Sequence, residues 1–153
     1  MQQGLLHMHN FLRWFVLLFG ILVIIRSMSG MNGNKPFAAG DKRMALFLLI
    51  SCDLQLLLGI SLYITKGWLD VLKNGVDMAN RVNRFFAIEH MLGMLVAIVL
   101  VHIGYSSIKK NIADSAKFKK LFWFTLIAFI LILVTIPWPF RELVGRPLFP
   151  GMH

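Results

Sequence analysis

The stretch RFFAIEHMLGMLVAIVLVHIGYSSIKK, which runs from Arg84 to Lys110, decides the fold of this chain. It is long and apolar enough to cross a bilayer as a helix, which takes about 20 apolar residues. The apolar run nevertheless contains Glu89, His90 and His102. Ionisable side chains within hydrocarbon cost a few kcal/mol each and usually serve a function. We therefore expect at least one of these three residues to have a role beyond packing.

The rest of the chain has the composition of a small membrane protein. Of its 153 residues, 58% are hydrophobic and only 15% are charged. Four apolar stretches recur, which predicts one all-α domain (residues 1–153) made of four transmembrane helices in an antiparallel, up-down bundle. The expected helices cover residues 5–26, 44–64, 85–108 and 121–137, and residues 138–153 form an interfacial tail. We expect no cleavable signal peptide, because no basic segment precedes the first helix.

Gly, Asn, Pro and Lys residues mark the connections between these helices. Pro137 and Pro139, in the run IPWPF, are expected to end the fourth helix because proline cannot continue one. The expected connections are Ser27–Asp41, the polar segment Lys66–Arg81 with a short surface helix at Trp68–Leu72, and the basic loop Asn111–Lys120.

The basic residues predict the orientation. The loops after the first and third helices hold nine Lys and Arg residues and the opposite side holds six. The positive-inside rule then places both termini on the outer side of the membrane and the loops after the first and third helices in the cytoplasm. The net charge of +9 is explained by these loops and by anionic headgroups, so we expect no nucleic-acid partner. Cys52 is the only cysteine, which excludes an internal disulfide and covalent haem attachment.

His9 and His90 are expected at the same depth. Each precedes the middle of its helix by six or seven residues, which is about 10 Å from the bilayer centre on the same side. Two histidines at equal depth in a four-helix bundle are the arrangement that ligates a b-type haem, with one nitrogen on each side of the iron. A hydrogen-bonded structural pair, another metal or contact with a quinone are the alternatives.

Neighbouring residues suit that haem. Gly20 shares a helix face with His9, and Gly93 shares one with His90, so both could leave room for a flat macrocycle. They also suit the ordinary close packing of membrane helices. Arg13 and Arg84 are candidates to pair with haem propionates.

The remaining polar residues are interpreted as structural or proton-handling groups. Asp53 and Gln55 lie near the middle of the second helix, where a carboxyl group needs a cation or a proton. We expect Arg13 to pair with Asp53 and Glu89 to join this network, which either fixes helix register or transfers protons. His7 is expected at the interface.

His102 lies about 18 Å deeper than His90 and has no matching histidine. Met28 or Met44 could ligate a second haem there, but we favour a single haem.

The whole chain resembles a family of small four-helix bacterial membrane proteins, frequent in Bacteroidota, that are labelled cytochrome b. The motifs that carry the resemblance are LLHMHNFLRW (5–14), LQLLLG (54–59), RFFAIEH (84–90) and IPWPF (136–140). The resemblance implies that His9 and His90 are axial ligands. The chain departs from the larger two-haem cytochromes, in which four histidines pair at two depths.

Three functions follow from these features. The first is electron transfer through one haem b near the outer face, with quinol or a larger respiratory complex as the partner. The second is a non-enzymatic accessory or assembly subunit of a membrane complex, or a homo-oligomer, without its own haem. A proton-coupled carrier that uses Asp53 and Glu89 ranks last, because neither repeats nor broken helices are evident. No hydrolase motif is present.

Overall fold

Four long helices make up most of the computed structural model, which describes residues 2–149. A π-helical turn, η1, joins the short helix α4 to α5, so that residues 81–107 form one continuous span. No strand occurs within residues 2–149, and the predicted all-α, four-helix transmembrane bundle is confirmed. The elements are α1 (Gln2–Gly30), α2 (Ala39–Thr65), α3 (Trp68–Lys73), α4 (Arg81–Arg84), η1 (Phe85–Glu89), α5 (His90–Ser107) and α6 (Asp114–Thr135).

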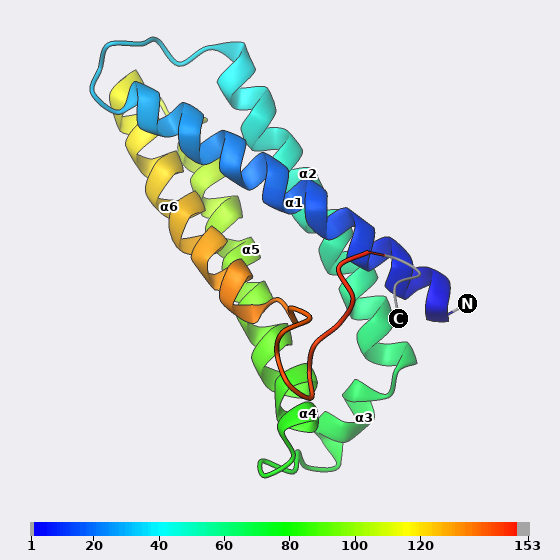
Figure 1. The fold of residues 1–153 in the computed structure, drawn as a ribbon. Coiled ribbons are helices and arrows are strands. Elements are labelled where there is room, and N and C mark those ends of the chain that lie inside the picture. Colours follow the sequence, from blue (N-terminus) through cyan, green and yellow to red (C-terminus); the bar gives the residue numbers. More distant parts are fainter. Residues whose placement is uncertain (1, 150–153) are drawn as a thin grey trace.

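The long helices pack as two antiparallel pairs, α1 with α2 and α5 with α6 (Figure 1). Helix α1 also packs on α6, whereas α2 and α5 contact each other least among neighbouring helices. One end of the bundle carries the N-terminus of α1, the helices α3 and α4, and the C-terminal coil (Figure 1). We call it the terminal end, and we call the opposite end the loop end. The two pairs lie further apart at the terminal end, where the coil runs between α6 and α1.

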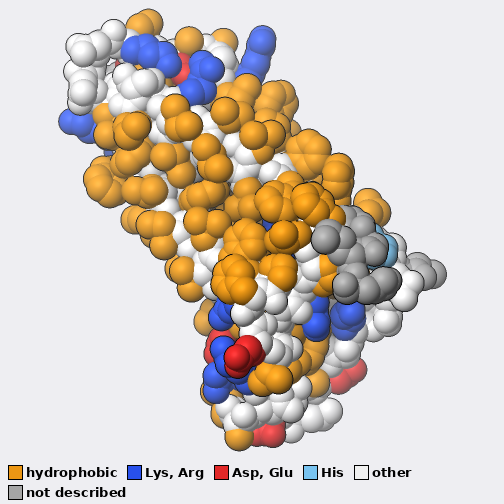
Figure 2. All heavy atoms as spheres, viewed as in Figure 1, with side chains coloured by type: hydrophobic (Ala, Val, Ile, Leu, Met, Phe, Trp, Pro, Cys, Tyr) orange, Lys and Arg blue, Asp and Glu red, His pale blue; other side chains and the backbone are white. Residues whose placement is uncertain are grey.

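The outside of the bundle is apolar. All four spans are long and apolar enough to cross a membrane, and large side chains such as Leu57 and Val134 are more than 60% exposed. Figure 2 shows an apolar belt with basic side chains gathered near both ends. Aliphatic side chains exposed in such a belt have no favourable contact with water, whereas lipid tails solvate them. The chain is therefore a multi-pass membrane protein.

The helices extend further at the loop end than the sequence predicts. Residues 27–30 continue α1, α2 begins at Ala39 and α6 begins at Asp114, so the connections are shorter than the expected loops. Asp41 explains part of this difference, because its carboxylate accepts from the Ala38 amide and pairs with Arg26 at 2.9 Å. Hydropathy marks the part of a helix within hydrocarbon, but polar residues with good helix propensity continue it into the interface.

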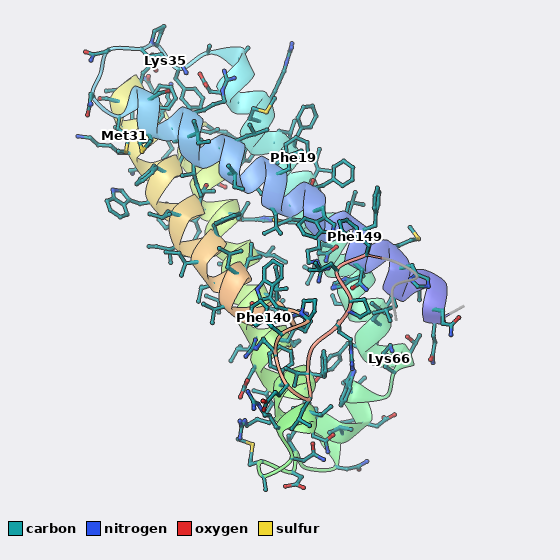
Figure 3. The ribbon with its side chains drawn as sticks, in the orientation of Figure 1. Phe19, Met31, Lys35, Lys66, Phe140 and Phe149 are labelled. Carbon is teal, nitrogen blue, oxygen red and sulfur yellow. The ribbon has the colours of Figure 1, made fainter. Side chains whose placement is uncertain are left out.

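Two sequence predictions agree with the structure outside the spans. The short helix α3 lies where a surface helix was expected, and α6 ends two residues before Pro137. The described part of the tail folds back over the bundle as a coil, with Phe140 near the end of α6 and Phe149 where the coil crosses α1 (Figure 3). The predicted tail residues 150–153 lie outside the described part of the chain.

Candidate functional site between the two helix pairs

The imidazole rings of His9 and His90 face each other inside the terminal half of the bundle. His9 lies on α1 and His90 is the first residue of α5. Their ring centroids are 6.4 Å apart and the ring planes are inclined at 70°. The two helices are not adjacent in the bundle, so each ring reaches inward from its own helix pair. The structure thus brings together the two histidines that the sequence placed at one depth.

The backbone around His90 positions its ring. The π turn Phe85–Glu89 immediately precedes His90, and such turns are frequent at functional sites. His90 Nδ1 lies 2.8 Å from the carbonyl oxygen of Thr135 on α6. A carbonyl can only accept, so Nδ1 carries the proton and donates it. The lone pair of a neutral His90 is consequently on Nε2, which no other hydrogen bond in the described chain occupies.

The prolines after α6 explain why the Thr135 carbonyl is free to accept this bond. In a continuing helix it would accept from the amide four residues on, which is at Pro139 and has no hydrogen. In the same way, Pro137 deprives the Leu133 carbonyl of its partner. The Leu133 carbonyl instead accepts from the indole of Trp138 at 2.8 Å. The run IPWPF therefore both ends the helix and exposes the carbonyl that orients His90.

His9 is held against α2. A Cβ on Gly59 would lie 3.5 Å from His9 Cε1, which is ordinary contact, so the ring packs on this glycine. The side-chain amide of Gln55 donates to the backbone carbonyl of His9 at 3.0 Å. His9 Nδ1 is buried without a hydrogen-bond partner among the described residues. Its neighbours thus fix the position of His9 but leave the hydrogen-bonding capacity of its ring unused.

Both rings line one cavity of about 280 Å³. The cavity lies between the two helix pairs, and residues of α1, α2, η1, α5 and α6 line it. Ile60 of α2, which is 48% exposed, is one of its lining residues. Leu56, Met94 and Ile98 provide apolar walls deeper in the bundle. The site is therefore an apolar slot with two imidazoles facing each other.

The predicted polar network around Asp53 is not formed, and this expectation was wrong. Asp53 Oδ1 lies 3.0 Å from His102 Nε2 across the seam between α2 and α5. Glu89 pairs with Arg84 at 2.7 Å on the surface. Arg13 faces the coil instead. The expectation compared depths along straight parallel helices, whereas the splayed pairs bring Asp53 level with a deeper residue of α5.

The Arg13 side chain is buried, with 5% exposure, and its guanidinium binds the C-terminal coil. Its guanidinium donates to the carbonyl oxygen of Leu148 at 2.7 Å. The indole of the neighbouring Trp14 donates to the same oxygen at 3.1 Å and stacks on Phe149. Arg13 therefore anchors the coil over the mouth of the site.

Gly20 and Gly93 do not leave the open space expected for a macrocycle. A Cβ on Gly20 would lie 2.7 Å from the ring of Phe129, and a Cβ on Gly93 would lie 2.5 Å from Thr135 Cγ2. Both glycines thus permit close packing against α6, the alternative that the sequence left open. Arg84, occupied by Glu89 and by the Met78 carbonyl, does not line the cavity either.

Several features of the site could not be found from hydropathy and depth alone. These are the π turn, the Thr135 carbonyl, and two cavity-lining cations at the terminal end, Lys66 and Arg146. Only the carbonyl had a sequence signal, since a proline four residues later removes the amide that would bond it.

His9 and His90 are the residues that could ligate a metal centre at this site. No group of three His, Cys, Asp or Glu side chains that could hold a metal occurs among residues 2–149. Zinc and similar ions need three or four protein ligands, whereas a porphyrin supplies four nitrogens and needs only axial ones. Two imidazoles that share a metal have centroids about 6 Å apart, from bonds of about 2.0 Å. The observed 6.4 Å fits that arrangement.

Comparison with known proteins assigns no identity to the chain. No family model, curated protein or solved structure matches it. The resemblance to small proteins labelled cytochrome b therefore stays a prediction.

Proposed function

We propose that this chain is a membrane electron-transfer protein in which His9 and His90 ligate one b-type haem. The proposal rests on the position of the two imidazole rings, whose centroids are 6.4 Å apart. It is supported by the hydrogen bond from His90 Nδ1 to a backbone carbonyl. Metal-ligating histidines nearly always donate their second nitrogen in this way. The haem would supply one-electron chemistry. The chain would supply the two imidazoles, their orientation and an apolar surrounding that tunes the potential.

The proposal extends to location and partners. With nine basic residues near the loop end against six at the terminal end, the terminal end faces the periplasm of a bacterial inner membrane. The site then lies in the outer leaflet, where it exchanges electrons with quinol or with a larger respiratory complex.

The test is the absorption spectrum of protein purified from haem-replete cells. We expect a dithionite-reduced minus oxidised spectrum of a six-coordinate b-type haem, lost in His9→Ala and in His90→Ala. His7→Ala is the matched control, because His7 lies two residues from His9 but is exposed and does not line the cavity. A wild-type preparation with no pyridine-haemochrome signal would refute the proposal. Co-purification of a stoichiometric partner with that colourless protein would favour the accessory-subunit function instead.

Quinone binding in the same slot is a second candidate, carried by the size of the cavity. At about 280 Å³ it is slightly smaller than the roughly 300–1,000 Å³ of sites that enclose drug-sized ligands. A quinone headgroup fits this volume, whereas the larger haem macrocycle would need the two helix pairs to move apart. Labelling of α2 and α5 peptides by an azido-quinone, competed by unlabelled quinone, would support this candidate. Equal labelling of all four spans would count against it.

A further inference from the structure

The cavity has a charged rim as well as an apolar interior. Three of its lining residues are cations, namely Arg13, Lys66 and Arg146, and no Asp or Glu is among the lining residues. An apolar slot with positive charge at its edge favours a ligand that is apolar and carries an anionic group.

The three cations differ in how much of their hydrogen-bonding capacity is in use. Arg13 is committed to the carbonyl oxygen of Leu148, as described above. Lys66 and Arg146 form no ion pair with any carboxylate in residues 2–149. The cations available to a ligand are therefore Lys66 and Arg146.

The fold holds both of these cations at the terminal end of the cavity. Lys66 directly follows the last turn of α2, and its amide donates to the Leu62 carbonyl at 2.9 Å (Figure 3). The amide of Arg146 donates to the Pro137 carbonyl at 2.9 Å. Its guanidinium lies 4.8 Å from the ring centre of Phe86 in η1, which restricts the side chain by a cation–π contact. Two cations from different elements thus line the terminal end of one slot.

We propose that Lys66 and Arg146 bind the carboxylates of the ligand that occupies this cavity. This inference rests on the proposed function, under which the carboxylates are the two propionates of haem. The imidazoles lie within the apolar part of the slot, whereas the two cations lie at its polar edge. An amphipathic ring bound by both sets of residues directs its carboxylates toward the membrane surface. Charge-assisted hydrogen bonds of this kind are stronger than neutral ones.

Titration of the purified protein, freed of bound haem, with haem and with haem dimethyl ester tests the inference. The ester keeps the iron and the ring but has no carboxylate charge. For Lys66→Gln and Arg146→Gln we expect about tenfold weaker binding of haem in each case and unchanged binding of the ester. Lys73→Gln in α3 is the control, because Lys73 is a lysine of the same end of the bundle that does not line the cavity.

The outcomes separate this inference from the function on which it rests. If the wild type binds haem and both variants bind it equally well, only the role of Lys66 and Arg146 is overturned. Equal losses for haem and ester also overturn it, since they indicate a merely structural effect of the substitutions. Failure of the wild type to bind either compound overturns the proposed function and this inference together.

Discussion

Replacement of Gly93 by alanine tests how the bundle orients His90. A Cβ at this position would lie 2.5 Å from Thr135 Cγ2 and 3.4 Å from its Cβ. Thr135 cannot rotate away easily, because its side chain is β-branched and its hydroxyl donates to the Leu131 carbonyl at 2.7 Å. The new methyl group therefore pushes α6 away from α5 at the residue whose carbonyl accepts from His90.

The expected magnitude follows from three contributions. Normal carbon–carbon contacts are near 3.5–4.0 Å, so the 2.5 Å approach at Gly93 requires a shift of the order of 1 Å. Overpacking of this kind costs about 1–3 kcal/mol. The gain in helix propensity from glycine to alanine offsets about 0.5–1 kcal/mol. A weakened hydrogen bond between His90 and Thr135 adds about 1 kcal/mol, so we expect a net loss of about 1–3.5 kcal/mol.

The assay is reversible unfolding of the purified protein in mild detergent, followed by tryptophan fluorescence. Gly59→Ala is the matched control, because Gly59 also lies within a membrane span but its Cβ would make only an ordinary contact at 3.5 Å. Nitrogen-15 NMR of labelled histidine reports whether His90 Nδ1 is still protonated. Stability of Gly93→Ala equal to that of Gly59→Ala, with the His90 signals unchanged, would refute the reasoning.

Further substitutions test other contacts. Asp53→Ala and His102→Ala should each destabilise the protein by about 1 kcal/mol, because each leaves an ionisable partner unpaired within a membrane span. The double variant should lose less than the sum in the same unfolding assay, and additivity would mean that the pair does not interact. Arg13→Met should release the C-terminal coil and speed its proteolysis at least several-fold, whereas an unchanged cleavage rate would show that Arg13 does not anchor it.

The sequence was sufficient for the number of spans and for the depth of the histidine pair. Both follow from counting along a helix, since hydrocarbon sets the span length and each residue adds about 1.5 Å. Depth is a one-dimensional quantity, and His9 and His90 lie near equivalent ends of parallel helices. The depth of a residue does not show which side chains of neighbouring helices are in contact. Asp53 shows the limit, because its partner His102 lies on α5 at a residue that straight helices would place too deep.

The helix faces around the site show a second limit of the sequence. Gly20 and Gly93 share faces with the histidines, but a glycine on an inward face is equally able to admit a cofactor or a neighbouring helix. In the structure Phe129 and Thr135 occupy these positions. The choice depends on how closely α6 packs against α1 and α5 at these positions, which no local sequence motif shows.

The histidine contacts also bear on the direction of electron flow under the proposed function. Four of the five histidines lie in the described chain; His7 is exposed and His102 is bonded to Asp53. His9 and His90 are the one pair of these four whose rings face each other. Electron transfer across the membrane would need a second haem site near the loop end. His102 lies toward that end, but its Nε2 is bonded to Asp53 of α2. We infer that electrons enter and leave at the terminal end, so donor and acceptor would both bind at that face of the membrane.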